Sequence, residues 1–129
     1  MDQRLLLSLL FFTAMTHTTA VFAGEEKCVN LTWYGGAAGN HGKTIKGILY
    51  PVENKLIYDW KNGTMEFIWT LPEGMKSGDP DGFEGTWQQD DAKGTFTLKE
   101  NRKTAIFEGQ WKRQGRTKGG KLKVEYCKN

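Results

Sequence analysis

The sequence predicts an all-β protein, an antiparallel up-and-down meander of about eight strands closed into a small barrel. Three observations support this class. Apolar and polar residues alternate in short runs between turn-rich segments, no later stretch of ten residues has helical periodicity, and the only two cysteines lie near the ends of the predicted mature chain. The expected strands are 28–34, 44–50, 55–61, 64–71, 82–88, 94–99, 104–112 and 120–126.

The N-terminal segment has the layout of a secretory signal peptide. An apolar run follows Arg4 and ends in the small-residue pattern Val21-Phe22-Ala23. The run is well short of the ~20 apolar residues that cross a bilayer. We therefore expect residues 1–23 to be removed and residues 24–129 to form a single secreted β-barrel domain, periplasmic or extracellular, with no membrane span.

The two cysteines are expected to form a disulfide in an oxidising compartment. In an eight-strand meander the first and last strands run antiparallel, so Cys28 and Cys127 would meet across the seam of the barrel. Closing a loop of about 100 residues is worth on the order of 4–5 kcal/mol in the chain-entropy model.

The first two expected strands follow a period of two. Val29, Leu31 and Trp33 share the inward face of the first strand, and the second turns Ile45, Gly47 and Leu49 inward.

The next two strands are expected to form a tight hairpin. Asn62-Gly63 is the preferred pair for a two-residue type I′ turn. In that register Tyr58 faces Phe67, with Trp60 opposite Met65 and Leu56 opposite Trp69.

A near-repeat marks the later strands: "FEGTW" at 83–87 and "FEGQW" at 107–111. The Phe, Gly and Trp of each copy fall on the inward face, with glycines at Gly85 and Gly109. Glycine within a strand marks a bend or a close approach of neighbouring groups, so the motif indicates curvature and core packing. The intervening and final strands turn Phe96, Leu98, Leu122, Val124 and Tyr126 inward.

In this layout the chain resembles the small secreted calycin-type barrels, the avidin and lipocalin group. The resemblance implies an eight-stranded up-and-down barrel with an aromatic interior, and no ligand is transferred from it. The hairpins within 83–124 also resemble MORN repeats, in which an aromatic-x-Gly-x-Trp strand is followed by a Gly-rich turn and a second strand.

Composition argues against several classes of function. Eighteen Lys and Arg face fifteen Asp and Glu, a net charge of +3, which is too mild for a dedicated nucleic-acid surface. The predicted mature chain has a single Ser, Ser77, and a single His, His41. We therefore predict no enzyme, no metal and no cofactor, and keep an enzyme only as a minor alternative.

The remaining prediction is binding. Scarce inward polar groups favour a packed core, with a cavity for one small ligand as the alternative. A small apolar or aromatic ligand would be bound by the inward aromatic residues: Trp33, Tyr58, Trp60, Trp69, Trp87, Trp111 and Tyr126.

The alternative function is a protein-binding inhibitor or immunity-type factor with a secreted protein partner. It would act through loops that the topology gathers at one rim of the barrel. The rim residues are Asn40, His41, Asp90, Asp91, Arg113, Arg116 and Lys118.

Overall fold

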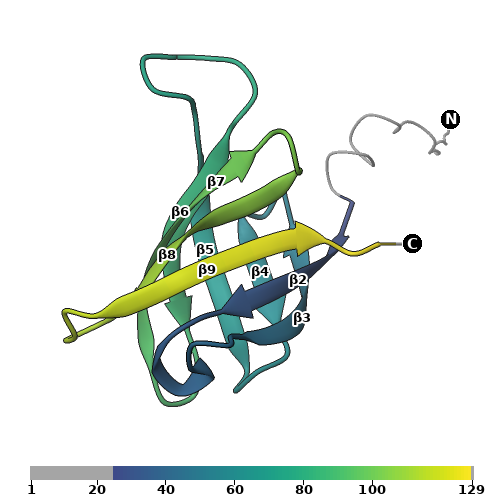
Figure 1. Cartoon of the computed structure of the whole chain (residues 1–129). Coiled ribbons are helices and arrows are strands. Elements are labelled where there is room, and N and C mark those ends of the chain that lie inside the picture. Colours follow the sequence, from purple (N-terminus) through teal and green to yellow (C-terminus); the bar gives the residue numbers. More distant parts are fainter. Residues whose placement is uncertain (1–24, 129) are drawn as a thin grey trace, which may run out of the picture.

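The computed structural model describes residues 25–128, which form eight antiparallel strands closed into a barrel (Figure 1). The predicted signal peptide lies outside the described residues. The strands are β2 (Lys27–Trp33), β3 (Lys43–Tyr50), β4 (Lys55–Tyr58), β5 (Gly63–Thr70), β6 (Gly82–Gln88), β7 (Lys93–Asn101), β8 (Ile106–Arg113) and β9 (Gly119–Tyr126). A short 3₁₀ turn, η1 (Gly36–Ala38), follows β2. No helix in this range is long and apolar enough to cross a membrane.

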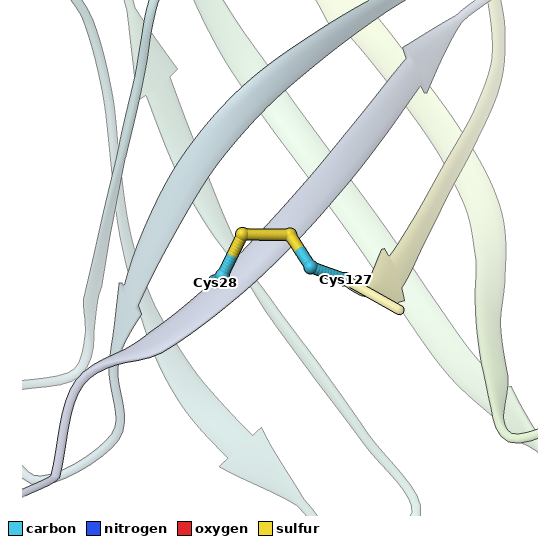
Figure 2. Close-up of a disulfide and its surroundings, with 2 residues drawn as sticks. All are labelled: Cys28 and Cys127. Carbon is cyan, nitrogen blue, oxygen red and sulfur yellow. A yellow bond between two sulfur atoms is a disulfide. The ribbon is translucent and has the colours of Figure 1, made fainter. Parts of the chain in front are cut away.

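Every strand pairs with its neighbours in the sequence, and β2 pairs with β9 to close the barrel. At this seam Val29 lies opposite Tyr126 and Trp33 opposite Leu122. The predicted Cys28–Cys127 disulfide extends the seam by one residue pair, with Cα atoms 5.4 Å apart (Figure 2). The backbone N–H of Cys127 also donates to the Cys28 carbonyl at 3.0 Å. The predicted fold class and disulfide are therefore confirmed.

The connections divide between two ends of the barrel. The β2–β3, β4–β5, β6–β7 and β8–β9 connections form one end, here called the mouth. The other three connections, with the disulfide and both ends of the described range, residues 25 and 128, form the opposite end, here called the far end. The long β5–β6 loop projects from the far end in Figure 1.

The core is built from alternate residues of each strand, as the period-two pattern predicts. The predicted inward residues Leu31, Phe83 and Leu98 have no exposed surface. Tyr126 is the main departure, because it is 40% exposed at the far end of β9.

The glycines of the near-repeat are required by the curved wall. A Cβ atom at Gly85 would collide with the carbonyl oxygen of Glu66 on β5, and one at Gly109 with that of Thr97 on β7. Neighbouring backbones thus approach where the missing side chains leave room. Phe83 and Trp87 lie on either side of Gly85, and both are buried.

The predicted β4–β5 register is wrong by four residues. Tyr58 pairs with Gly63 and Leu56 with Met65, so the turn is the four-residue segment 59–62. Gly63 is the first residue of β5 and not part of the turn. The position requires glycine, because the Tyr58 ring occupies the space that a Cβ atom would need. Lys61 and Asn62 adopt left-handed φ angles of 52° and 54°, which allow the longer loop.

Contacts to β3 and to the β6–β7 loop hold this turn. The Asp59 N–H donates to the Lys46 carbonyl, and the Asp90 N–H donates to the Lys61 carbonyl, both at 2.9 Å. Trp60 consequently lies in the loop at the mouth instead of within a strand.

Candidate functional site: a tryptophan-lined cavity at the barrel mouth

A cavity of about 470 Å³ occupies the mouth of the barrel. All four connections at this end, or the strand ends beside them, contribute to its lining. The lining residues are Trp33, Gly35, Gly36, Ala37, Ala38, Trp60, Lys61, Trp87, Gln89, Asp91, Ala92, Trp111, Arg113, Arg116, Thr117, Lys118 and Gly119.

Four of the five tryptophans of the chain line the cavity. The Trp33 ring lies 6.4 Å from Trp60, 5.7 Å from Trp87 and 5.8 Å from Trp111, measured between ring centroids. All three contacts are edge-to-face, the geometry that the ring quadrupole favours. The cavity is therefore bounded by a continuous aromatic cluster centred on Trp33.

The indole N–H groups differ in how they are satisfied. Trp87 donates to the carbonyl oxygens of Thr95 and Lys112 at 3.2 and 3.0 Å. Trp111 donates to the Tyr34 carbonyl at 2.9 Å. Trp33 is only 3% exposed, and its N–H has no partner within residues 25–128.

An unpaired buried donor costs about 1–3 kcal/mol. Because the Trp33 N–H is itself fully enclosed, that cost remains among the described residues, and the group is not presented to the cavity.

A second polar group lies behind the tryptophans. The Gln89 side chain donates to the Tyr58 hydroxyl at 2.9 Å, and the Tyr58 ring is 5.6 Å from Trp33. Burial raises the pKa of Tyr58 to about 12, although the Gln89 hydrogen bond acts in the opposite direction. Tyr58 is therefore neutral at physiological pH.

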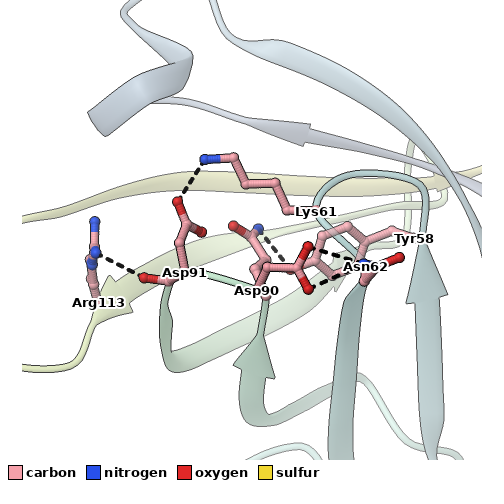
Figure 3. Close-up of polar contacts among 7 residues, drawn as sticks. Tyr58, Lys61, Asn62, Asp90, Asp91 and Arg113 are labelled. Carbon is pink, nitrogen blue, oxygen red and sulfur yellow. Dashed lines mark hydrogen bonds and ion pairs between the residues drawn. The ribbon is translucent and has the colours of Figure 1, made fainter.

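Charged side chains lie at the rim of the cavity, and Figure 3 shows the contacts that Lys61, Asp91 and Arg113 make there. Lys61 Nζ lies 2.7 Å from a carboxylate oxygen of Asp91, and this hydrogen bond holds the pKa of Asp91 below its ordinary value. Arg113 donates to the Asp91 backbone carbonyl at 3.2 Å. Asp90 accepts from the Asn62 amide at 3.0 and 3.1 Å. The β4–β5 loop, the β6–β7 loop and the end of β8 are thus tied together at the rim.

The structure divides the predicted ligand-binding residues between the two ends. Trp33, Trp60, Trp87 and Trp111 line the cavity. Tyr58 lies behind Gln89 and is not part of the lining.

The other two predicted residues lie at the far end. Trp69 packs against Phe67 and Phe83 and donates to the Pro51 carbonyl at 3.3 Å. Tyr126 packs against Phe107 with ring centroids 6.2 Å apart.

The predicted rim residues are likewise only partly brought together. Asp91, Arg113, Arg116 and Lys118 line the cavity. Asp90 is engaged by Asn62, outside the lining.

The other two predicted rim residues lie away from the cavity. Asn40 borders a separate pocket of about 490 Å³, beside Tyr34 and Lys121. His41 is exposed in the same connection and is not part of the cavity wall.

Two lining residues that the sequence did not indicate are Lys61 and Gln89. The two-residue turn assigned Lys61 to a strand, and Gln89 sits in a connection with no distinctive motif. Both residues lie in loops that the topology gathers at one rim, and this convergence could have predicted that they line the cavity.

Comparison with family models, with curated proteins and with solved structures found no match to this chain. The closed eight-stranded meander is compatible with a calycin-like layout. Within residues 25–128, no three His, Cys, Asp or Glu side chains are grouped as metal ligands would be.

Proposed function

We propose that this protein binds a small apolar or aromatic molecule in the tryptophan-lined cavity. The observation that carries the proposal is the gathering of four tryptophans around an opening of about 470 Å³. Small-molecule sites commonly have volumes of 300–1,000 Å³, with aromatic walls and a few polar groups that fix orientation. Here the charged side chains of the rim are such polar groups.

The energetics favour a flat or elongated apolar ligand. Burial of apolar surface contributes roughly 25 cal/mol per Å², and each well-placed aromatic pair adds about 0.5–1.5 kcal/mol. Contact with three or four indole rings would therefore add about 1.5–6 kcal/mol to the contribution of the buried apolar area.

We also propose that the protein acts outside the cytoplasm. The Cys28–Cys127 disulfide is favoured in an oxidising compartment. The predicted signal peptide agrees with that location. Export would give a mature protein beginning at Gly24, which N-terminal sequencing of the secreted material would check.

The binding proposal can be tested by titration with N-phenyl-1-naphthylamine, a neutral dye that fluoresces in apolar surroundings. We expect saturable binding to the disulfide-bonded protein, with quenching of tryptophan emission. Trp60→Ala should weaken binding at least about tenfold, which is 1.4 kcal/mol of lost contact. Trp69→Ala is the matched control, because Trp69 is also half-buried but lies at the far end.

A second variant tests the same cavity in case Trp60→Ala does not fold. Ala92 lines the cavity, so the larger side chain of Ala92→Leu would occupy part of the cavity without removing a contact. This variant should bind the dye less tightly while retaining its thermal stability. Failure of the wild-type protein to bind, or equal loss in the Trp60 and Trp69 variants, would contradict the proposal. Capture of a protein partner by the rim loops would then be the better hypothesis.

A further inference from the structure

We propose that the ligand of this cavity carries an anionic group, a sulfonate, carboxylate or phosphate, bound at the rim by Arg113, Arg116 and Lys118. The ligand class is thus an amphiphilic anion with an aromatic or aliphatic body. This inference rests on the proposed function, because it assumes that the body of the ligand enters between the tryptophans.

The charge of the cavity wall is the first argument. Five ionisable side chains line the cavity, and four of them are basic: Lys61, Arg113, Arg116 and Lys118. The single acid, Asp91, is already hydrogen-bonded to Lys61 at 2.7 Å. Among the described residues, Arg113, Arg116 and Lys118 form no ion pair. Since the whole chain has a net charge of only +3, the basic excess is concentrated at this opening.

The position of Arg113 is the second argument. Arg113 follows Trp111 by two residues on β8, so both side chains leave the strand on the same face. The Arg113 side chain therefore leaves β8 two residues farther toward the mouth than the Trp111 side chain does. Its hydrogen bond to the Asp91 carbonyl at 3.2 Å anchors one of its nitrogens and leaves its other donors available. A molecule that stacks on Trp111 would bring its outer end to this guanidinium.

The alternative is a cationic ligand, because a group of tryptophans can form a cage for an ammonium ion. Trp60 already has two ammonium groups near its ring, with Lys43 Nζ 4.9 Å and Lys61 Nζ 5.8 Å from the centroid. A further cation would meet these amines and the basic rim together. The charge distribution therefore favours an anion, which can form charge-assisted hydrogen bonds with arginine.

Two dyes with the same ring system isolate the contribution of the anion. The first is 8-anilinonaphthalene-1-sulfonate, and the second is N-phenyl-1-naphthylamine, which lacks the sulfonate. At 10 mM salt we expect the sulfonate dye to bind at least fivefold more tightly. At 1 M salt this preference should largely disappear, because the Debye length falls from about 30 Å to about 3 Å.

Charge variants locate the effect. Combining Arg116→Gln with Lys118→Gln should reduce the preference for the sulfonate dye at least twofold, and Arg113 should retain part of it. The matched control combines Arg102→Gln with Lys103→Gln, which removes the same charges from the β7–β8 turn at the far end. That control should retain the preference. Asp91→Asn removes the acid that neutralises Lys61 and should increase the preference about twofold.

The outcomes separate this inference from the proposed function. Equal affinity of the wild-type protein for the two dyes, with N-phenyl-1-naphthylamine binding still sensitive to Trp60→Ala, would overturn the anionic ligand and leave the binding function intact. Equal loss of preference in the rim and control variants would also overturn it. Binding of neither dye would overturn both proposals.

Discussion

The two ends of the barrel share the same strands but are filled differently. At the far end, Phe83 packs against Phe67, Phe96 and Phe107 with ring centroids 4.5, 5.8 and 5.2 Å apart, and the disulfide ties β2 to β9. At the mouth, four tryptophans surround a cavity of about 470 Å³ instead of filling it. The first end has the features of a packed core, and the second has those of a binding site.

The near-repeat explains how one motif serves both ends. β6 and β8 both run from the far end to the mouth, so each places its Phe in the packed half and its Trp at the opening. A Trp needs a hydrogen-bond acceptor when buried, whereas a Phe does not. Carbonyls near strand ends meet this need, since Trp87 and Trp111 donate to Lys112 and Tyr34.

The largest expected effect concerns the disulfide at the far end. Replacing Cys28 and Cys127 by Ser should cost on the order of 4 kcal/mol of unfolding free energy, because the bridge closes a loop with a sequence separation of 99. Urea unfolding of both proteins would measure the loss. Dye affinity should be unchanged in the folded variant, because the disulfide lies away from the mouth. A change in the dye affinity of the folded variant would contradict this and would show that the two ends are coupled.

The next largest effect is expected from Phe83, which is fully buried at the far end. Phe83→Ala should cost about 3–5 kcal/mol, as large-to-small core substitutions do. Trp60→Ala should cost less than half of this, because Trp60 is half-buried beside an existing cavity. Thermal unfolding of the two variants would compare the ends directly. Equal losses would mean that the mouth is part of the packed core.

A somewhat smaller effect is expected at the curved wall between the ends. Gly109→Ala would place a methyl group against the Thr97 carbonyl, so we expect a loss of about 3 kcal/mol. Gly115→Ala is the control. Gly115 lies in the turn closed by the Arg116 N–H and the Arg113 carbonyl, with open space around it and a φ of 80°, which should cost only about 1–2 kcal/mol. The reverse order in chemical denaturation would contradict the curvature assigned to the motif.

The smallest expected effect compares tyrosines at the two ends by pH. The pKa of Tyr58 is about 12, against an ordinary value of 10.0, so the unfolded chain loses this proton first as pH rises. Stability is therefore fully present below pH 10 and declines between about pH 10 and 12, by on the order of 2 kcal/mol. Tyr58→Phe should remove this part of the decline.

Tyr126 provides the comparison at the far end. Burial, and then the charge of Glu100, raise the pKa of Tyr126 too, but this side chain is 40% exposed. Tyr126→Phe should therefore change the alkaline decline less than Tyr58→Phe does. Urea unfolding at pH 9 and at pH 11.5 would compare the variants, and an equal effect of both would contradict the burial of Tyr58.

Much of the barrel could be predicted from the sequence because its strands follow a strict period of two. That period places Leu31, Phe83 and Leu98 inward whatever the neighbouring strand is, and all three are buried. The position of the disulfide follows from the meander in the same way.

The register of β4 could not be predicted, because Asn62-Gly63 suits a two-residue turn equally well. The actual turn depends on contacts that are distant in the sequence, such as Asp90 with Lys61 and Asn62. For the same reason, the inward parity could not separate Trp69 from the tryptophans at the mouth. The period gives the face of a strand but not the depth of a residue along the barrel.

The most direct test of the account uses the five indole N–H signals in a nitrogen-15 NMR spectrum. Titration with N-phenyl-1-naphthylamine should shift the signals of Trp33, Trp60, Trp87 and Trp111, and that of Trp69 should stay in place. Shifts of similar size in all five, or a change confined to Trp69, would contradict a ligand site at the mouth.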